Sequence, residues 1–178
     1  MSTQMPNLER RHTIAVLVDN EPGVLARVIG LFAGRGYNIE SLTVSEIDAV
    51  KGYSRITIVT SGTDMVIEQI KALLDRLVPV HMVEDLTIQG PCLERELALV
   101  KVVNSGESRI EALRIADMFR AHAIDSTLDS FVFELTGSPQ KLNAFIELMT
   151  ELGETEITRG GVVAIARGNT VGLKTSQY

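Results

Sequence analysis

The stretch between residues 20 and 25 holds the groups in this sequence best suited to binding a small ligand. It reads Asn20-Glu21-Pro22-Gly23-Val24-Leu25 and joins an apolar, strand-like run to a predicted helix. Unpaired N–H groups at a helix N-terminus attract an anion, and Gly23 has no Cβ to keep a carboxylate away from the backbone. The Asn20 amide can bind an ammonium or a carboxylate, and Asn38 in the next strand could reach the same loop. These groups suit an amino acid with an apolar side chain.

The same residues also have a purely structural interpretation. Asn20 can serve as the N-cap of the helix, and Gly23 can relieve crowding in the turn. Pro22 suits the first turn of that helix, where no backbone N–H is needed. From the residues alone, neither interpretation is favoured over the other.

The sequence offers no constellation typical of an enzyme or a metal site. It has no glycine-rich phosphate loop, no C-x-x-C, no H-E-x-x-H and no G-x-S-x-G. The sequence identifies no base that would activate Cys92, and Glu94 and Glu96 flank Arg95, which favours a solvated, charged start of a strand. Three histidines lie on separate predicted elements, without neighbours at metal-ligand spacing: His12, His81 and His122. We therefore expect neither a catalytic site nor a metal.

Composition narrows the class of protein further. The chain has 178 residues, 45% of them apolar, and a net charge of −6. Five Phe, three Tyr and no Trp, with an acidic balance, argue against a nucleic-acid surface. The longest aliphatic run, Ile14 to Val18, falls far short of the ~20 residues of a membrane span. The first eleven residues contain no apolar segment and the chain has a single cysteine, so we expect a cytoplasmic protein.

Strand-like and helix-like periods alternate in the order β-α-β-β-α-β along the first half of the chain. Strands are predicted at residues 12–18, 38–45, 54–60 and 80–88. A helix after Pro22 should bury apolar residues at helical spacing: Leu25, Val28, Ile29 and Phe32. A second helix over residues 64–77 should bury Val66, Ile70, Leu73 and Leu77. This order is the ferredoxin-like arrangement.

The same order repeats after a break at Gln89-Gly90-Pro91. Strands are predicted at residues 97–103, 124–128, 131–135 and 156–166, and the two helices have recognisable starts. Ser108 to Glu111 resembles a capping box, and Ser138-Pro139 an N-cap followed by proline. The helices should bury two apolar stripes: Ala112, Ile115, Ala116 and Phe119, then Leu142, Phe145, Ile146 and Met149. We expect an α+β fold of two tandem ferredoxin-like βαββαβ domains, over residues 10–89 and 94–168, with a polar tail over 169–178.

Four stretches of the sequence together resemble one known family. They are HTIAVLVDNEPGVLARVIGLFAGRGYNIESLTV at 12–44, SRITIV at 54–59, ERELALVKV at 94–102 and RGGVVAIARG at 159–168. The chain resembles the regulatory small subunits of acetolactate synthase, also called acetohydroxyacid synthase, over roughly residues 10–168. The run from Asn20 to Leu42 is specific to that family and goes beyond the D-x-P-G-x-L theme common to ACT domains.

The resemblance implies that residues 10–89 are an ACT domain that forms a homodimer, with two sheets side by side. The family acts in branched-chain amino acid biosynthesis. Its feedback inhibitor, usually valine, would bind at the interface between the two ACT domains. By resemblance, Asn20 and Gly23 of one subunit and Asn38 of the neighbouring subunit would contact the inhibitor. Backbone groups would line the rest of the pocket: Pro22, Val24, Leu25 and Ile39. Relatives often carry a proline-containing acidic turn where this chain has Glu46 to Gly52.

The resemblance also implies a partner. A catalytic large subunit would carry thiamine diphosphate, magnesium and FAD, none of which this chain is expected to bind, and the small subunit would raise its activity. One alternative is a stand-alone amino-acid-sensing ACT module that controls another enzyme or a regulator. Two weaker alternatives on this fold are an acylphosphatase-like enzyme, which Arg11 and Asn20 match poorly, and an RNA-binding domain. The central strands carry Ile, Val and Thr instead of the aromatic residues that RNA stacking needs.

Overall fold

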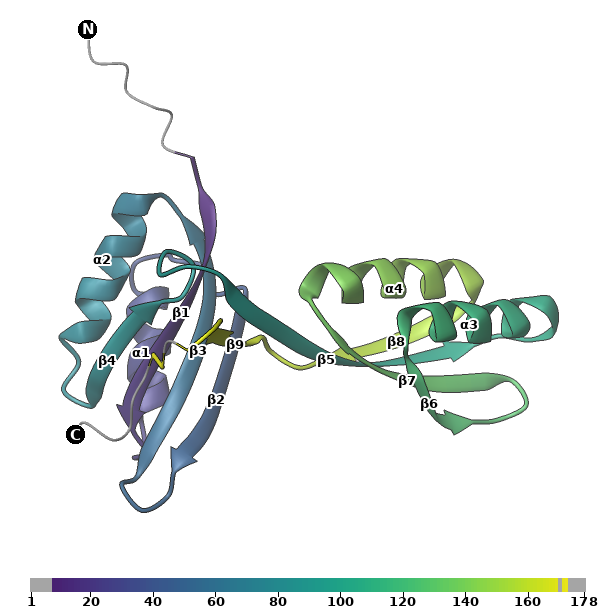
Figure 1. Ribbon diagram of the computed structural model, residues 1–178, viewed down its shortest axis with the longest axis horizontal. Coiled ribbons are helices and arrows are strands. Elements are labelled where there is room, and N and C mark those ends of the chain that lie inside the picture. The colour runs from purple at the N-terminus through teal and green to yellow at the C-terminus, as the bar shows by residue number, and fades with distance from the viewer. Residues whose placement is uncertain (1–7, 170, 173–178) are drawn as a thin grey trace, which may run out of the picture. The chain divides into compact units, whose positions relative to one another are not determined.

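The computed structural model describes residues 8–169, 171 and 172 (Figure 1). The chain divides into two compact units. Unit 1 contains the chain up to Leu93 and again from Ala164 onward, and unit 2 is Glu94–Val163. No helix in the described part of the chain is long and apolar enough to cross a membrane.

Unit 1 follows the predicted βαββαβ order. Its elements are β1 (Arg10–Asp19), α1 (Val24–Ala33), β2 (Ser41–Asp48), β3 (Tyr53–Gly62), α2 (Asp64–Asp75) and β4 (Val80–Asp85). The four strands pair antiparallel in the order β2-β3-β1-β4. The central strand β1 is buried from His12 to Val18, as its unbroken apolar run predicts, with alternate residues in two different clusters.

Both helices of unit 1 pack on one face of the sheet. Eleven buried apolar residues form that core: Ile14, Val16, Val18, Val24, Val28, Phe32, Ile56, Ile58, Ile67, Ile70 and Leu74. The predicted buried face of α2 is therefore only partly right, since Leu74 and Ile67 replace Leu73 and Val66 at its centre. The Thr63 hydroxyl accepts a hydrogen bond from Val66 N and so caps the start of the helix.

Unit 2 repeats the order with its own core. Its elements are α3 (Gly106–Phe119), β6 (His122–Ser126), β7 (Ser130–Gly137), α4 (Pro139–Leu152), β8 (Glu154–Arg159) and the greater part of β5 (Cys92–Val103). The strand order is β6-β7-β5-β8, and β9 (Val163–Ala166) pairs with β5. The core contains Ala98, Val100, Val102, Ala112, Ile115, Ala116, Phe131, Phe133, Leu135, Leu142, Phe145 and Met149. The predicted α+β fold with βαββαβ order in both halves is thus confirmed.

The two predicted helix starts in unit 2 have different outcomes. Ser138 is the N-cap of α4, and its hydroxyl accepts a hydrogen bond from Lys141 N at 3.3 Å, with Pro139 as the first helical residue. The capping box at Ser108 is wrong, because α3 already begins at Gly106 and Ser108 lies within its first turn. Just before this helix, the side-chain amide of Asn104 donates to the Ser108 carbonyl at 3.1 Å.

The single strand predicted over residues 156–166 is also wrong. Gly160 and Gly161 interrupt it, and two separate strands result, β8 and β9. The described residues from Ala164 to residue 169 cluster with unit 1, whereas the sequence interpretation places the chain up to residue 168 in the second domain. Of the expected polar tail, only residues 169, 171 and 172 lie among the described residues.

Candidate functional site

The loop between β1 and α1 forms a tight turn that requires glycine. Gly23 has φ 87° and ψ −7°, and Val24 N lies 3.5 Å from the Glu21 carbonyl oxygen. These values, with Pro22 in the preceding position, are those of a type II turn. The helix begins only at Val24, so the expectation that Pro22 occupies its first turn is wrong.

The structure rules out both structural roles that the sequence offered for this loop, Asn20 as the helix N-cap and Gly23 as relief of crowding. The N-cap residue of α1 is Gly23, with no side-chain capping bond, so Asn20 does not cap the helix. A Cβ built on Gly23 meets no atom within 4 Å, so crowding does not explain the glycine either. Among the described residues, the Asn20 side chain is exposed and makes no hydrogen bond, while its backbone N donates to the Gly52 carbonyl at 2.6 Å. The loop therefore presents an uncapped helix N-terminus beside an amide with unused hydrogen-bonding capacity.

Contacts behind the loop hold it in place. Asp19 N donates to the Pro79 carbonyl at 2.9 Å, and the Asp19 carboxylate lies 2.7 Å from Nε2 of His81. The ring of His81 in turn packs against that of Tyr53, with centroids 4.9 Å apart. The backbone around Asn20 is thus fastened to β3 and β4, which leaves its exposed side open to a ligand.

Asn38 and Ile39 lie at the other end of the sheet. Ser41 pairs with Val59, and Val59 with Thr13 near the start of β1, whereas Asn20 follows the end of β1. Within one chain, Asn38 therefore cannot reach the loop, and the expectation that it does is corrected. Asn38 is exposed and its carbonyl accepts from the Thr60 hydroxyl at 2.6 Å, while Ile39 packs on the core.

An exposed apolar surface lies next to these residues. Leu25 and Ile29 of α1 were predicted to be buried, but 37% and 40% of their surfaces are exposed. On the edge strand β2, Val44 and Ile47 are similarly exposed, at 44% and 41%. Helical spacing marked Leu25 and Ile29 as apolar but did not reveal that the described residues of the same unit cover them only in part.

The remaining candidate residues have structural partners. His12 lies 2.7 Å from the Asp85 carboxylate in a buried pair, and the described residues offer no partner to its Nε2. Glu96 was expected to be solvated, but it is buried and accepts a hydrogen bond from Arg159 at 2.5 Å. No group of three or more His, Cys, Asp or Glu that could hold a metal occurs among residues 8–169, 171 and 172.

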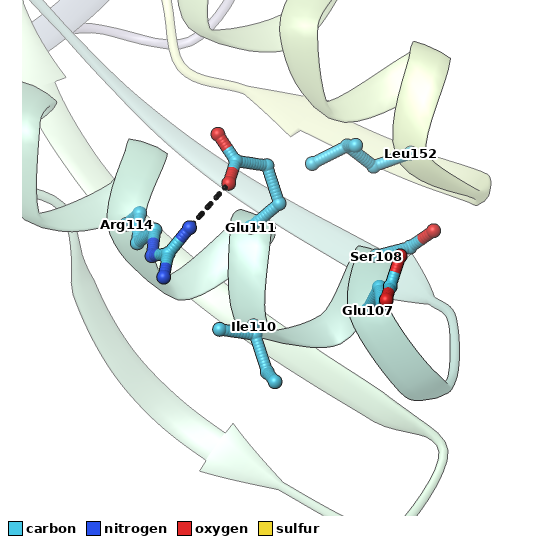
Figure 2. A pocket seen from close by; sticks show the side chains of 6 residues that line it. All are labelled: Glu107, Ser108, Ile110, Glu111, Arg114 and Leu152. Carbon is cyan, nitrogen blue, oxygen red and sulfur yellow. Dashed lines mark hydrogen bonds and ion pairs between the residues drawn. The ribbon is translucent and has the colours of Figure 1, made fainter.

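Unit 2 has an open groove of about 480 Å³ along α3 (Figure 2). Its lining is mixed: Glu107, Ser108, Ile110, Glu111, Arg114 and Leu152. Arg114 donates to Glu111 at 3.3 Å, and these lining residues include no nucleophile with an adjacent base. The loop of unit 1 therefore remains the best candidate for a ligand site.

Comparisons with known proteins agree on one family. Residues 95–168 match the family model "Small subunit of acetolactate synthase", and residues 14–82 match "AHAS small subunit-like ACT domain". A probable acetolactate synthase small subunit of Archaeoglobus fulgidus is 47% identical over 89% of this chain and 98% of its own length. The isozyme 3 small subunit of Escherichia coli is 44% identical, over 90% and 98%. The crystal structure of the acetolactate synthase small subunit from Thermotoga maritima superposes with a TM-score of 0.82 at 39% identity, covering 90% of this chain and 99% of that one.

Proposed function

The chain belongs to the family of acetolactate synthase small regulatory subunits, and on that basis we propose that it activates a separate catalytic large subunit and makes it sensitive to valine. Thiamine diphosphate, magnesium and FAD bind the large subunit in this proposal, and this chain contributes none of their ligands. The chain acts by binding an amino acid and passing the effect of that binding to its partner.

One feature of unit 1 supports this function most strongly. Gly23 in the left-handed region, an uncapped helix N-terminus and the free Asn20 amide converge on one exposed loop. A helix N-terminus favours the carboxylate of an amino acid, and an amide oxygen can accept a hydrogen bond from its ammonium group. The exposed Leu25 on the first turn of α1 offers an apolar contact for a branched side chain.

Strand register supports a dimer that completes this site. In β2, Asp48 pairs with Tyr53, which pairs with Asp19, so the end of β2 lies at the same end of the sheet as the loop. If two β2 edges pair antiparallel around a two-fold axis, the start of one β2 meets the end of the other. Asn38 and Ile39 of the second subunit then come to the end of the sheet where Asn20 and Gly23 lie. The same pairing covers the exposed apolar residues of β2 and α1.

In this proposal, the position of the ligand between two subunits explains how its binding inhibits the large subunit. A ligand can shift an equilibrium only if it binds one quaternary arrangement better than another, and a site built from two subunits exists in only one docked arrangement. A coupling free energy of about 1–3 kcal/mol changes affinity by about 5- to 150-fold. Valine binding would therefore favour the arrangement in which the large subunit is less active.

Two experiments test the proposal. Isothermal titration calorimetry should show saturable binding of L-valine, with D-valine as the control of matched composition. The absence of saturable binding for every branched-chain amino acid would refute the effector site. The large subunit of the same organism should co-purify with this chain and form acetolactate from pyruvate faster when the two are mixed. Valine binding without either effect would instead favour a stand-alone amino-acid sensor.

A further inference from the structure

The face of the unit 1 sheet opposite the helices is covered by chain that returns from unit 2. We call residues 164–169 the strap. Ala164 is buried and packs against Ala15 and Leu17, which are wholly buried. Leu86 completes this small core, with Tyr53, Met82 and Cys92 at its margin. Figure 1 shows β9, which contains the start of the strap, beside β3. Ala164 thus covers part of the face that the helices leave open.

The strap is held by the pairing of β9 with β5 and by hydrogen bonds to unit 1. Arg55 of β3 donates from Nη2 to the Ala164 carbonyl at 2.7 Å, the one hydrogen bond that the described residues give its side chain. Arg167 N donates to the Pro91 carbonyl at 2.9 Å. Nearby, the buried Oε2 of Glu84 finds no partner among the described residues, and a side chain at Gly172 would collide with that carboxylate.

Two polar groups beside the strap are partly desolvated. Burial lowers the pKa of Arg55, with the negative charge of Glu84 opposing the shift, so the guanidinium is partly desolvated without a full set of acceptors. An unpaired buried carboxylate oxygen also carries a desolvation cost. Release of the strap returns both groups to water, and their hydration offsets part of the free energy needed to expose the apolar surface around Ala164.

A chain of contacts joins the strap to the ligand loop. The Asp19 carboxylate is hydrogen-bonded to His81, the ring of His81 packs on Tyr53, and Tyr53 packs in the same cluster as Ala164. Asn20 N is bonded to the carbonyl of Gly52, directly before Tyr53. A change in the loop therefore changes the surface on which the strap rests.

The strap also continues one of the two covalent connections between the units. The chain enters unit 2 at Leu93–Glu94 and leaves it at Val163–Ala164.

We propose that the strap is a regulatory latch: ligand binding at the β1–α1 loop and attachment of the strap stabilise each other. Release of the strap leaves unit 2 tied to unit 1 by a single connection. This inference rests on the proposed effector site and adds the route by which its occupancy reaches unit 2.

Coupling of this kind is reciprocal, so it can be measured from both ends. In hydrogen exchange of the whole chain, valine should slow exchange at the strap amides, above all Arg167 N–H. Arg55→Ala should speed that exchange and weaken valine binding by a similar factor, about tenfold for one hydrogen bond to a charged group. Arg55→Lys, which keeps the charge, gives the second variant should Arg55→Ala fold poorly. Lys101→Ala, which removes the cation of an exposed pair in unit 2, should change neither quantity.

The outcomes separate the latch from the effector site. Faster strap exchange in Arg55→Ala with an unchanged valine affinity overturns the coupling. If wild-type protein binds no branched-chain amino acid, the proposed function fails, and the link is then tested without ligand. Asp19→Asn, which weakens the contact to His81, should still speed exchange at the strap while the β1 core amides stay protected. Unchanged strap exchange in that variant refutes the link between loop and strap.

Discussion

Substitutions at Gly23 test the ligand site because the structure separates their effects on folding from those on binding. At φ 87° an L residue is strained, by about 1–2 kcal/mol for alanine and less for asparagine or aspartate. No atom of the chain lies within 4 Å of the added Cβ, so no clash adds to this strain. Gly23→Ala should therefore lower the free energy of unfolding by about 1–2 kcal/mol, measured by urea denaturation.

A comparison of Gly23→Asn with Gly23→Asp isolates the effect of an added negative charge on valine affinity. The two side chains have nearly the same size and tolerate this backbone conformation, so strain and steric effects largely cancel in the ratio of their affinities. A carboxylate about 4 Å from that of the ligand costs about 1 kcal/mol in water and about 4 kcal/mol at an effective dielectric constant of 20. Because the loop is exposed, we expect a value near the lower limit, about 1–2 kcal/mol, or valine binding about 5- to 30-fold weaker in Gly23→Asp.

The assay is calorimetric titration of L-valine into each variant at low ionic strength, repeated at high salt. High salt screens the carboxylate added in Gly23→Asp, because it lies on an exposed loop. The valine affinities of Gly23→Asn and Gly23→Asp should therefore become more similar. Equal valine affinities for Gly23→Asn and Gly23→Asp at low salt would refute the placement of the ligand carboxylate at this helix N-terminus.

Three further predictions concern stability and assembly. Asp85→Ala leaves the buried Nδ1 of His12 without its partner and should lower the free energy of unfolding by about 1–3 kcal/mol, measured by urea denaturation. Ser138→Ala removes the cap of α4 and should cost about 1 kcal/mol, whereas Ser108→Ala, inside α3, should change stability by less than about 0.5 kcal/mol in the same assay. Leu25→Asp with Ile29→Asp should convert a dimer to monomers in analytical ultracentrifugation, and an unchanged dimer would contradict the proposed interface.

The parts of this fold that sequence reasoning captured depend on contacts within one element or between neighbouring ones. The unbroken apolar run of β1 predicts a central strand, and the Ser138-Pro139 pair specifies a helix start through bonds that span only three residues. The repeat of one element order on both sides of Gly90 is likewise visible from periodicity.

The errors arise where the deciding contact is remote in the sequence or where an apolar side chain stays partly exposed in its own unit. Helical spacing identified Leu25 and Ile29 as apolar, but spacing does not tell whether the covering surface lies in the same subunit. The role of Gly23 was ambiguous because its φ angle is not encoded in its residue type. Strand propensity continues through Gly160 into Ala164, yet Ala164 packs against Ala15 and Leu17 and its carbonyl accepts a hydrogen bond from Arg55, all more than one hundred residues earlier in the chain.

The most direct test of the regulatory function is reconstitution with the catalytic large subunit of the same organism. Acetolactate formation from pyruvate should rise when this chain is added, and L-valine should lower the rate of the complex but not that of the large subunit alone. In complexes made with Gly23→Asp, the valine concentration for half inhibition should rise by the factor measured in calorimetry. A rate that neither rises with this chain nor falls with valine would contradict the proposal that it is the regulatory subunit conferring feedback inhibition.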